Sequence, residues 1–238
     1  MRVSDTRRFP KNLWFVMAAV IIAVALLQPK PQLCADQQQG TKDPVIVYDK
    51  PVTDPTAYIE VVSQYPDYPS GDEFAAAACF LRAYGYNADI QDLIGYMNYS
   101  DTFDDMTFFG DAKTDTGCCS SSALTIAIDN YLSNKGGKMW VRNRSGIDFD
   151  ALSSYISSGK PAIVWYTSDG KDPNFISGSE RMQYPLYENS KTAVAYGIAD
   201  GSILLTDSTT GMVSRISLDE FESIWEECGS QCVIAYDQ

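Results

Sequence analysis

The chain has 238 residues, 45% of them hydrophobic, which is enough for one globular domain with a substantial core. Acidic residues outnumber basic ones by 31 to 18, so the formal net charge is −13, and there is no histidine. Such a surface repels phosphate backbones and anionic lipid headgroups, which disfavours a nucleic-acid role. A zinc site without histidine would need four thiolates, and the cysteine spacings offer no paired CxxC. We therefore expect no cofactor, no metal and no nucleic-acid partner.

The first 35 residues form a different kind of sequence from the rest. Four basic residues precede an unbroken apolar run from Leu13 to Leu27, and Leu33–Ala35 is an acceptable cleavage site. The run is shorter than the roughly 20 residues that span a bilayer comfortably. Residues 1–35 are thus predicted to be a cleaved signal peptide or, alternatively, an uncleaved membrane anchor. In both cases the rest of the chain lies outside the cytoplasm and meets a membrane only through this segment.

The cysteines are consistent with export, which permits disulfides. Five cysteines follow Cys34, and an odd number leaves at least one thiol free unless it pairs with another chain. Cys228 and Cys232 are close enough to bridge a helix end to a strand, whereas a bridge between adjacent Cys118 and Cys119 would be rare. Without residues 1–35 the chain keeps 13 basic and 30 acidic residues, a net charge near −17. Its partners are therefore expected to be neutral, cationic or metal-bound.

The first half of the chain is predicted to be mainly helical. Residues 36–56 are polar and interrupted by prolines, as in a linker, and the domain covers residues 57–238. A strand at Tyr58–Val62 precedes an Ala-rich helix at Glu73–Ala83, which we expect to be central and buried. Three more helices are predicted: from the Asp89 cap to Met97, at Ala123–Ser133 and at Phe149–Ser157. Residues 100–117 carry five aspartates without the register of a Ca²⁺ loop, so they are predicted to be a solvated loop.

The second half is predicted to be mainly strands. Five are expected, several of them ending in Gly or Asp turns: Pro161–Tyr166, Thr192–Ile198, Ser202–Thr206, Met212–Ile216 and Val233–Tyr236. Ser217 to Glu220 has the pattern of a capping box that opens a helix ending at Glu227. Helices followed by antiparallel strands indicate an α+β fold, with N-terminal helices packed on a C-terminal antiparallel sheet.

The stretch around Asp72 is the most informative part of the sequence. Gly71 and Asp72 form a turn that leads into the Ala-rich helix. A carboxylate at a helix start is commonly an N-cap in a favourable position relative to the helix dipole. Lys191 alone is typical of a surface lysine, and Gln64 and Asp207 alone are typical of loops and turns. These simple interpretations stay open for all four residues.

The order of several motifs resembles that of bacterial bacteriocin-processing, papain-like cysteine peptidases over about residues 55–237. Those enzymes carry a Gln, a Pro-rich turn and a Gly-Cys-Glu that opens an Ala-rich helix, where this chain has Gln64 and then Gly71-Asp72-Glu73. Their catalytic His begins a strand six residues before a Gly, which falls on Lys191, and their orienting Asp falls on Asp207. Further matches are Phe109–Asp111, Gly117, Gly159–Trp165, Phe221–Glu226 and Gly229–Gln231.

The resemblance implies a papain-like fold, with Gln64 as oxyanion donor and Asp207 as orienter. This chain, however, lacks the two reacting groups of those enzymes, the thiol nucleophile and the imidazole base. A thiol nucleophile needs its thiolate, which an imidazole and a helix N-terminus normally supply. Asp72 replaces the thiol, and Lys191 is a poor general base unless burial removes its proton. The domain is therefore expected to be a catalytically inactive peptidase relative that binds a peptide or protein segment in the former substrate cleft.

The charges of the site support a retained arrangement. Asp72, Lys191 and Asp207 carry the same net charge, −1, as a resting Cys⁻, His⁺ and Asp⁻ group, so we expect them to converge in space. The alternative is an active hydrolase with a non-standard nucleophile, either Asp72 itself or Cys118 or Cys119. The two cysteines lie just before a predicted helix, a position that lowers the pKa of a thiol. A purely structural or stalk protein is a third interpretation.

Overall fold

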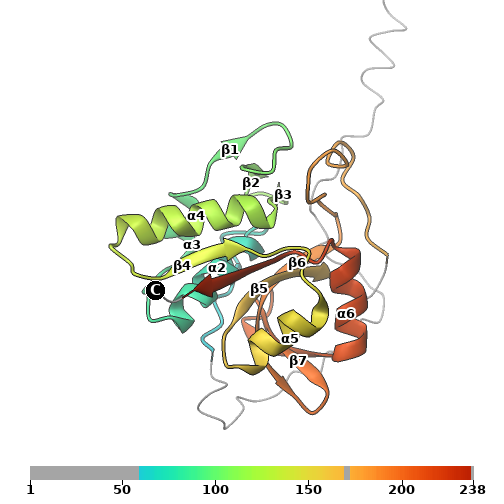
Figure 1. Cartoon of the computed structure of the whole chain (residues 1–238). Helices are drawn as coiled ribbons and strands as arrows, with labels where there is room; N and C mark the ends of the chain where they lie inside the picture. Colours follow the sequence, from blue (N-terminus) through green and yellow to red (C-terminus); the bar gives the residue numbers. More distant parts are fainter. Residues whose placement is uncertain (1–58, 169–171, 237–238) are drawn as a thin grey trace, which may run out of the picture. The chain divides into compact units, whose positions relative to one another are not determined.

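The computed structural model describes residues 59–168 and 172–236 (Figure 1). The predicted signal or anchor at 1–35 and the predicted linker at 36–56 lie outside these residues. No helix in the described part of the chain is both long and apolar enough to cross a bilayer. The fold is α+β, as predicted.

A six-stranded sheet forms the centre of the domain. Its strand order is β4-β9-β5-β6-β7-β8, and every neighbouring pair is antiparallel. The strands are β4 (Trp140–Asn143), β5 (Ala162–Thr167), β6 (Ser190–Ala199), β7 (Ser202–Asp207), β8 (Met212–Ser217) and β9 (Cys232–Tyr236). Five of them confirm predicted strands. The edge strand β4 was not predicted.

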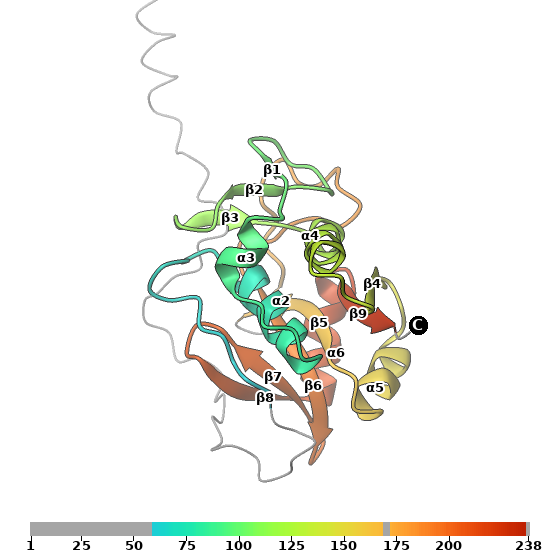
Figure 2. The same ribbon diagram turned by 90° about the vertical axis from the view of Figure 1, so that its left-hand side faces the viewer.

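Helices cover both faces of this sheet (Figures 1 and 2). On one face lie α2 (Asp72–Ala83), α3 (Ile90–Ile94) and α4 (Ser121–Asn134), and on the other lie α5 (Phe149–Ser157) and α6 (Leu218–Glu227). Successive residues of β5 alternate between the two cores, as a strand requires: Ile163 and Trp165 pack with α2, Val164 and Tyr166 with α6. Nearly all of α2 is buried, which confirms it as the central helix.

The predicted solvated loop at 100–117 is wrong, because this region contains most of a small second sheet. Its strands are β1 (Tyr99–Ser100), β2 (Phe108–Asp111) and β3 (Thr116–Cys118). The aspartates of the region organise turns, since Asp104 Oδ1 accepts the Met106 N–H at 2.7 Å and Asp111 Oδ1 accepts the Lys113 N–H at 2.9 Å. Within the described ranges no group of His, Cys, Asp and Glu side chains could hold a metal ion.

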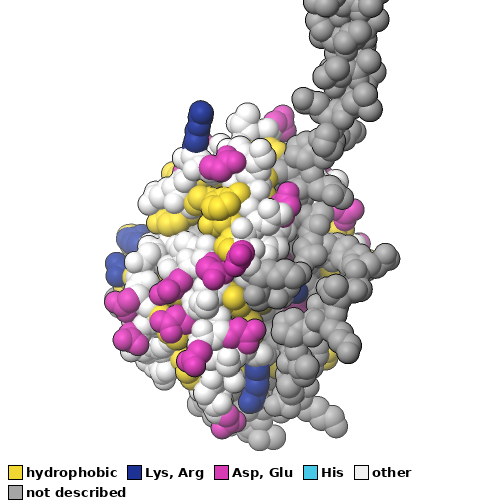
Figure 3. All heavy atoms as spheres, turned by 90° about the vertical axis from the view of Figure 1, so that its right-hand side faces the viewer, with side chains coloured by type: hydrophobic (Ala, Val, Ile, Leu, Met, Phe, Trp, Pro, Cys, Tyr) yellow, Lys and Arg dark blue, Asp and Glu magenta, His cyan; other side chains and the backbone are white. Residues whose placement is uncertain are grey.

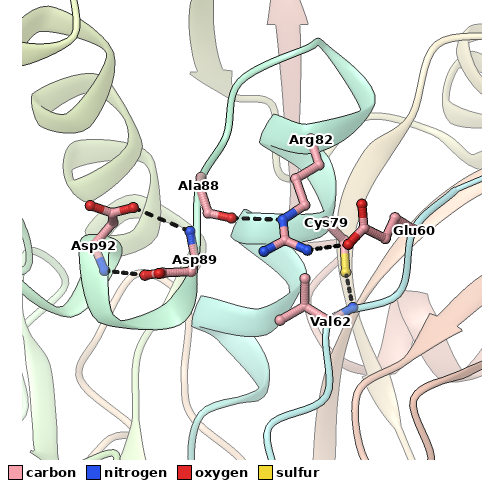
Figure 4. A network of polar contacts seen from close by, with 7 residues as sticks. All are labelled: Glu60, Val62, Cys79, Arg82, Ala88, Asp89 and Asp92. Carbon is pink, nitrogen blue, oxygen red and sulfur yellow. Dashed lines mark hydrogen bonds and ion pairs between the residues drawn. The ribbon is translucent and has the colours of Figure 1, made fainter.

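The predicted strand at Tyr58–Val62 is also wrong over its described residues, Ile59–Val62, which pair with no other strand. Instead, the Val62 N–H donates to Cys79 Sγ at 3.1 Å, and Glu60 forms an ion pair with Arg82 (Figure 4). Arg82 Nε also donates to the Ala88 carbonyl at 2.7 Å. This network fastens the segment that leads to Gln64 onto α2.

Candidate functional site

The site begins at the tight turn before α2. Gly71 is the N-cap of α2 and Asp72 is its first helical residue, so the interpretation of Asp72 as an N-cap is wrong. A Cβ atom at Gly71 would lie 2.6 Å from Tyr68 Cβ and 3.0 Å from the Tyr68 carbonyl oxygen. Only glycine fits this approach, which sets the direction in which the helix and its first carboxylate enter the site.

Asp72 connects α2 to the sheet. Its Oδ2 atom accepts the backbone N–H of Thr192, the third residue of β6, at 2.7 Å. Burial raises the pKa of this carboxyl, while hydrogen bonds with Glu73 and the Thr192 N–H and the positive charge of Lys191 act in the opposite direction. One oxygen of the carboxylate therefore accepts a backbone N–H of β6, and this hydrogen bond joins the helix to the strand.

Glu73 is a second acidic group beside the first, and it is 3% exposed. Its Oε1 atom accepts the Cys119 backbone N–H at 2.9 Å, which joins α2 to the residues before α4. Its Oε2 atom is buried and meets no N–H or O–H donor among the described residues. Burial and the neighbouring Asp72 carboxylate raise the pKa of Glu73 well above its usual value.

Gln64, the predicted oxyanion donor, is held by hydrogen bonds of both its backbone and its side chain. Its backbone N–H donates to the Ser208 carbonyl at 2.9 Å, and its Oε1 atom accepts the Ser208 hydroxyl at 2.6 Å. Its Nε2 atom donates to the Pro69 carbonyl at 2.6 Å. One N–H of the amide is thus committed to the protein, and only its second N–H could serve a ligand.

Asp207 and Lys191 lie at the ends of neighbouring strands. Asp207 ends β7, is 7% exposed, and its Oδ1 atom accepts the N–H groups of Thr209 and Thr210 at 2.9 and 3.4 Å. Lys191 is the second residue of β6, opposite Tyr166, and is half-buried. No ion pair within 4.0 Å among the described residues joins Lys191 to Asp72 or to Asp207.

The structure brings all four predicted site residues into one pocket. Gln64, Asp72, Lys191 and Asp207 line it together with Pro69, Ser70, Tyr166, Ser190, Thr192, Thr206, Ser208 and Thr209. The cavity is small, about 30 Å³, which is room for about two waters. A group that enters it must therefore be small, such as the tip of a side chain or a peptide group. The four residues thus share one pocket, whereas the expected close approach of Lys191 to a carboxylate and the roles of the residues stay predictions.

The cysteines offered as alternative nucleophiles are not poised for chemistry. Cys119 is 1% exposed, and burial followed by the nearby Glu73 and Asp72 carboxylates raises the pKa of its thiol well above the usual value. Cys118 is disulfide-bonded. Cys228 and Cys232, considered above as a bridge, are buried free thiols.

Among the contributors to the site that were not predicted, Glu73, Thr192 and Ser208 make the hydrogen bonds described above. A glutamate inside a run of buried alanines is a detectable signal, because a charged residue there needs a partner. Thr192 contributes through its backbone, and Ser208 through a contact with a residue 144 positions away, so neither leaves a local pattern.

A family model and a solved crystal structure agree with this fold. The model of the Peptidase C39 like family matches residues 56–233. The crystal structure of a protein described as a C39-like peptidase from Bacillus anthracis is similar with a TM-score of 0.62 and 16% identity, covering 76% of this chain and 98% of that one. The peptidase domain of Streptococcus ComA, described as a bifunctional ABC transporter in quorum sensing, has a TM-score of 0.46 and 18% identity. That match covers 76% of this chain and 100% of the other. No curated protein matches the chain.

Proposed function

Because the chain belongs to the Peptidase C39 like family, we propose that it is a peptidase relative that binds a peptide or protein segment without cleaving it. The observation that carries the proposal is Asp72 at the start of α2, with one oxygen bonded to the Thr192 N–H. A carboxylate held in this way is a poor nucleophile toward an amide, and the chain has no imidazole to activate another group.

The pocket has the properties of a recognition site. Its lining is mostly polar and presents hydroxyl, carboxylate, amide and ammonium groups. A few well-placed polar groups of this kind fix the orientation of a ligand. The strong negative charge of the whole chain favours a neutral or cationic segment over an acidic one.

The proposed place of action is outside the cytoplasm, with residues 1–35 acting as signal peptide or anchor. The support is the order of basic start, apolar run and small residue at Ala35. Sequencing the N-terminus of the protein recovered from its host tests this. A start near Asp36 supports cleavage, a membrane-bound full-length chain supports an anchor, and a full-length cytoplasmic chain refutes export.

The lack of thiol chemistry is tested with an epoxide-type probe for cysteine proteases and a peptide library. We expect no labelling and no cleavage, but retention of a subset of peptides on the immobilised protein. Lys191→Ala should change which peptides are retained, whereas Lys138→Ala should not, because Lys138 does not line the pocket. Labelling that Cys119→Ser abolishes, or cleavage that Asp72→Asn abolishes, would establish the active hydrolase instead.

A further inference from the structure

Asp72 and Glu73 place two carboxyl groups side by side, and the number of protons that this pair carries follows from its contacts. Each has one oxygen bonded to a backbone N–H, from Thr192 in β6 and from Cys119 before α4. The two carboxyls belong to consecutive residues in the first turn of α2, and a side-chain hydrogen bond between them lowers the pKa of Asp72 and raises that of Glu73. A hydrogen bond between two carboxyls requires that one of them carries a proton.

The proton belongs on Glu73. Its side chain is 3% exposed and its Oε2 atom is buried without a donor, so an ionised Glu73 would leave a charged oxygen unsatisfied in the core. Asp72 lines the open pocket, is less buried and feels the positive charge of Lys191, all of which favour its ionised form. The environments of the two groups thus assign them different protonation states.

We propose that Glu73 is a carboxylic acid in the folded protein and donates its proton to Asp72, so that the two act as one acid pair with a single negative charge. The pair joins three elements, because it ties the start of α2 to β6 and to the residues before α4. Loss of the Glu73 proton places two like charges side by side at this junction and weakens it. The proton thereby determines both the charge of the pocket and the stability of the contacts that join α2 to β6 and to the residues before α4.

Other titratable groups around the pair do not replace this proton. Cys119, whose backbone N–H bonds Glu73, keeps its thiol protonated, because burial and the two carboxylates raise the pKa of this thiol well above its usual value. Tyr65, before α2, is also kept neutral by burial and by nearby carboxylates, Asp115 and Asp72. Lys191 of β6 and Asp207 of β7 share the pocket with Asp72.

The direction of the pH effect follows from the protonated state of Glu73. Its pKa in the folded protein lies well above 4.5, its ordinary value, so the folded state binds more protons than the unfolded state above that pH. Stability from the pair is therefore complete below about pH 4.5 and is lost as the pH rises toward the folded pKa. Ordinary salt-bridged carboxylates have the opposite dependence.

The test is chemical denaturation between about pH 5 and pH 8 of the full chain, in wild type and in Glu73→Gln. Glutamine keeps an acceptor for the Cys119 N–H and an N–H donor for Asp72, but it does not titrate. The unfolding constant of the wild type should rise with pH by up to about tenfold per unit, the limit for one proton. Glu73→Gln should flatten this slope, and Glu226→Gln, which changes an exposed carboxyl, should leave it unchanged.

A direct measurement accompanies it, namely the pH titration of the Glu73 side-chain carboxyl by ¹³C NMR in the wild-type protein. The carboxyl should stay protonated well above its ordinary pKa, and Asp72→Asn should move its titration downward because the neighbouring charge is removed. A Glu73 that titrates near pH 4.5, or a Glu73→Gln variant with the slope of the wild type, would overturn the proposal. Neither readout needs a ligand, so both are independent of the proposed peptide binding.

Discussion

At the scale of single residues, Asp72 has a structural role that a thiol could not fill equally well. A carboxylate oxygen accepts the Thr192 N–H at 2.7 Å and so connects α2 to β6 across the site. A cysteine sulfur is a weak acceptor by comparison. The carboxylate at this position therefore strengthens the junction between α2 and β6 that lines the pocket.

Two variants of Asp72 measure how much its hydrogen bond with the Thr192 N–H contributes to the free energy of unfolding. Asp72→Ala leaves the Thr192 N–H without its acceptor and should lower the free energy of unfolding by about 1–3 kcal/mol. Asp72→Asn keeps an acceptor oxygen and removes a partly buried charge, so its cost should be clearly smaller. Urea denaturation of both proteins gives the comparison. Equal costs for the two variants would show that the charge, and not the hydrogen bond, stabilises the junction.

A second test concerns Gly71 and the tight turn that leads into α2. Gly71→Ala places a Cβ atom 2.6 Å from Tyr68 Cβ, so the turn or the helix start has to shift. We expect a loss of about 1–3 kcal/mol, as for overpacked sites. Gly95→Ala is the matched control, because its nearest contact is a looser 3.2 Å and its φ is −67°. A Gly71→Ala protein as stable as Gly95→Ala would show that the turn is not tight.

Much of the candidate site could be predicted from the sequence, because the family resemblance depends on the order of motifs along the chain. That order placed Gln64, Asp72, Lys191 and Asp207 together, and they do line one pocket. It could not show that Gln64 is bonded to Pro69 and Ser208, or that Asp72 reaches Thr192. Those contacts depend on backbone positions and on rotamers, which residue spacing does not specify.

At the scale of elements, the network around Arg82 fixes the position of the chain segment that leads to Gln64 (Figure 4). Arg82 bonds both Glu60 and the Ala88 carbonyl, so it joins the segment before the site to the loop after α2. Glu60 is largely exposed, and its ion pair is expected to contribute less than about 1 kcal/mol. Arg82→Ala should cost about 1–2 kcal/mol, because it also leaves a backbone carbonyl unpaired.

A double-mutant cycle separates these contributions. Glu60→Ala, Arg82→Ala and the double variant are compared by urea denaturation, and their coupling energy should be no larger than the cost of Glu60→Ala. A large coupling energy would mean that the ion pair itself holds the segment in place.

Asp105 plays a comparable role for the loop after β5. Its two carboxylate oxygens accept the N–H groups of Gln183 and Tyr184 at 3.0 and 3.4 Å. Asp105→Ala should therefore speed proteolytic cleavage and hydrogen exchange around these residues, while Asp101→Ala, at an exposed position, should not. Added Ca²⁺ should leave the thermal midpoint of the wild type unchanged. A rise of several degrees with Ca²⁺ would show that the aspartates bind the ion.

The elements that were missed share a physical cause. β1, β2 and β3 have two to four residues each, too few for an alternating pattern to appear. β4 was missed because Trp140 and Arg142 are exposed on an edge strand, so its sequence lacks a continuous apolar run. Longer elements, such as α2, β6 and β7, were predicted correctly because their burial leaves a strong hydrophobic signal.

At the scale of the whole molecule, strong negative charge and a polar pocket coexist with the fold of the Peptidase C39 like family. Figure 3 shows one face of the domain, on which acidic side chains are more numerous than basic ones. Such a surface raises the local concentration of cationic partners and repels acidic ones. Under the proposed function, a segment that enters the pocket is therefore expected to be neutral or cationic.

The same scaffold should allow a reactive thiol to be introduced at the start of α2. Asp72→Cys places a thiol at the N-terminus of α2, where the helix dipole favours its thiolate, and Lys191→His adds a base in the same pocket. At pH 7 the double variant should react with iodoacetamide faster than Asp72→Cys alone, because nucleophile and base act as a unit. The native thiols give little background, since burial raises the pKa of Cys79 to about 11 and that of Cys228 and Cys232 to about 12. Lys138→His combined with Asp72→Cys is the matched control, and equal rates in all three proteins would show that Lys191 does not occupy the histidine position.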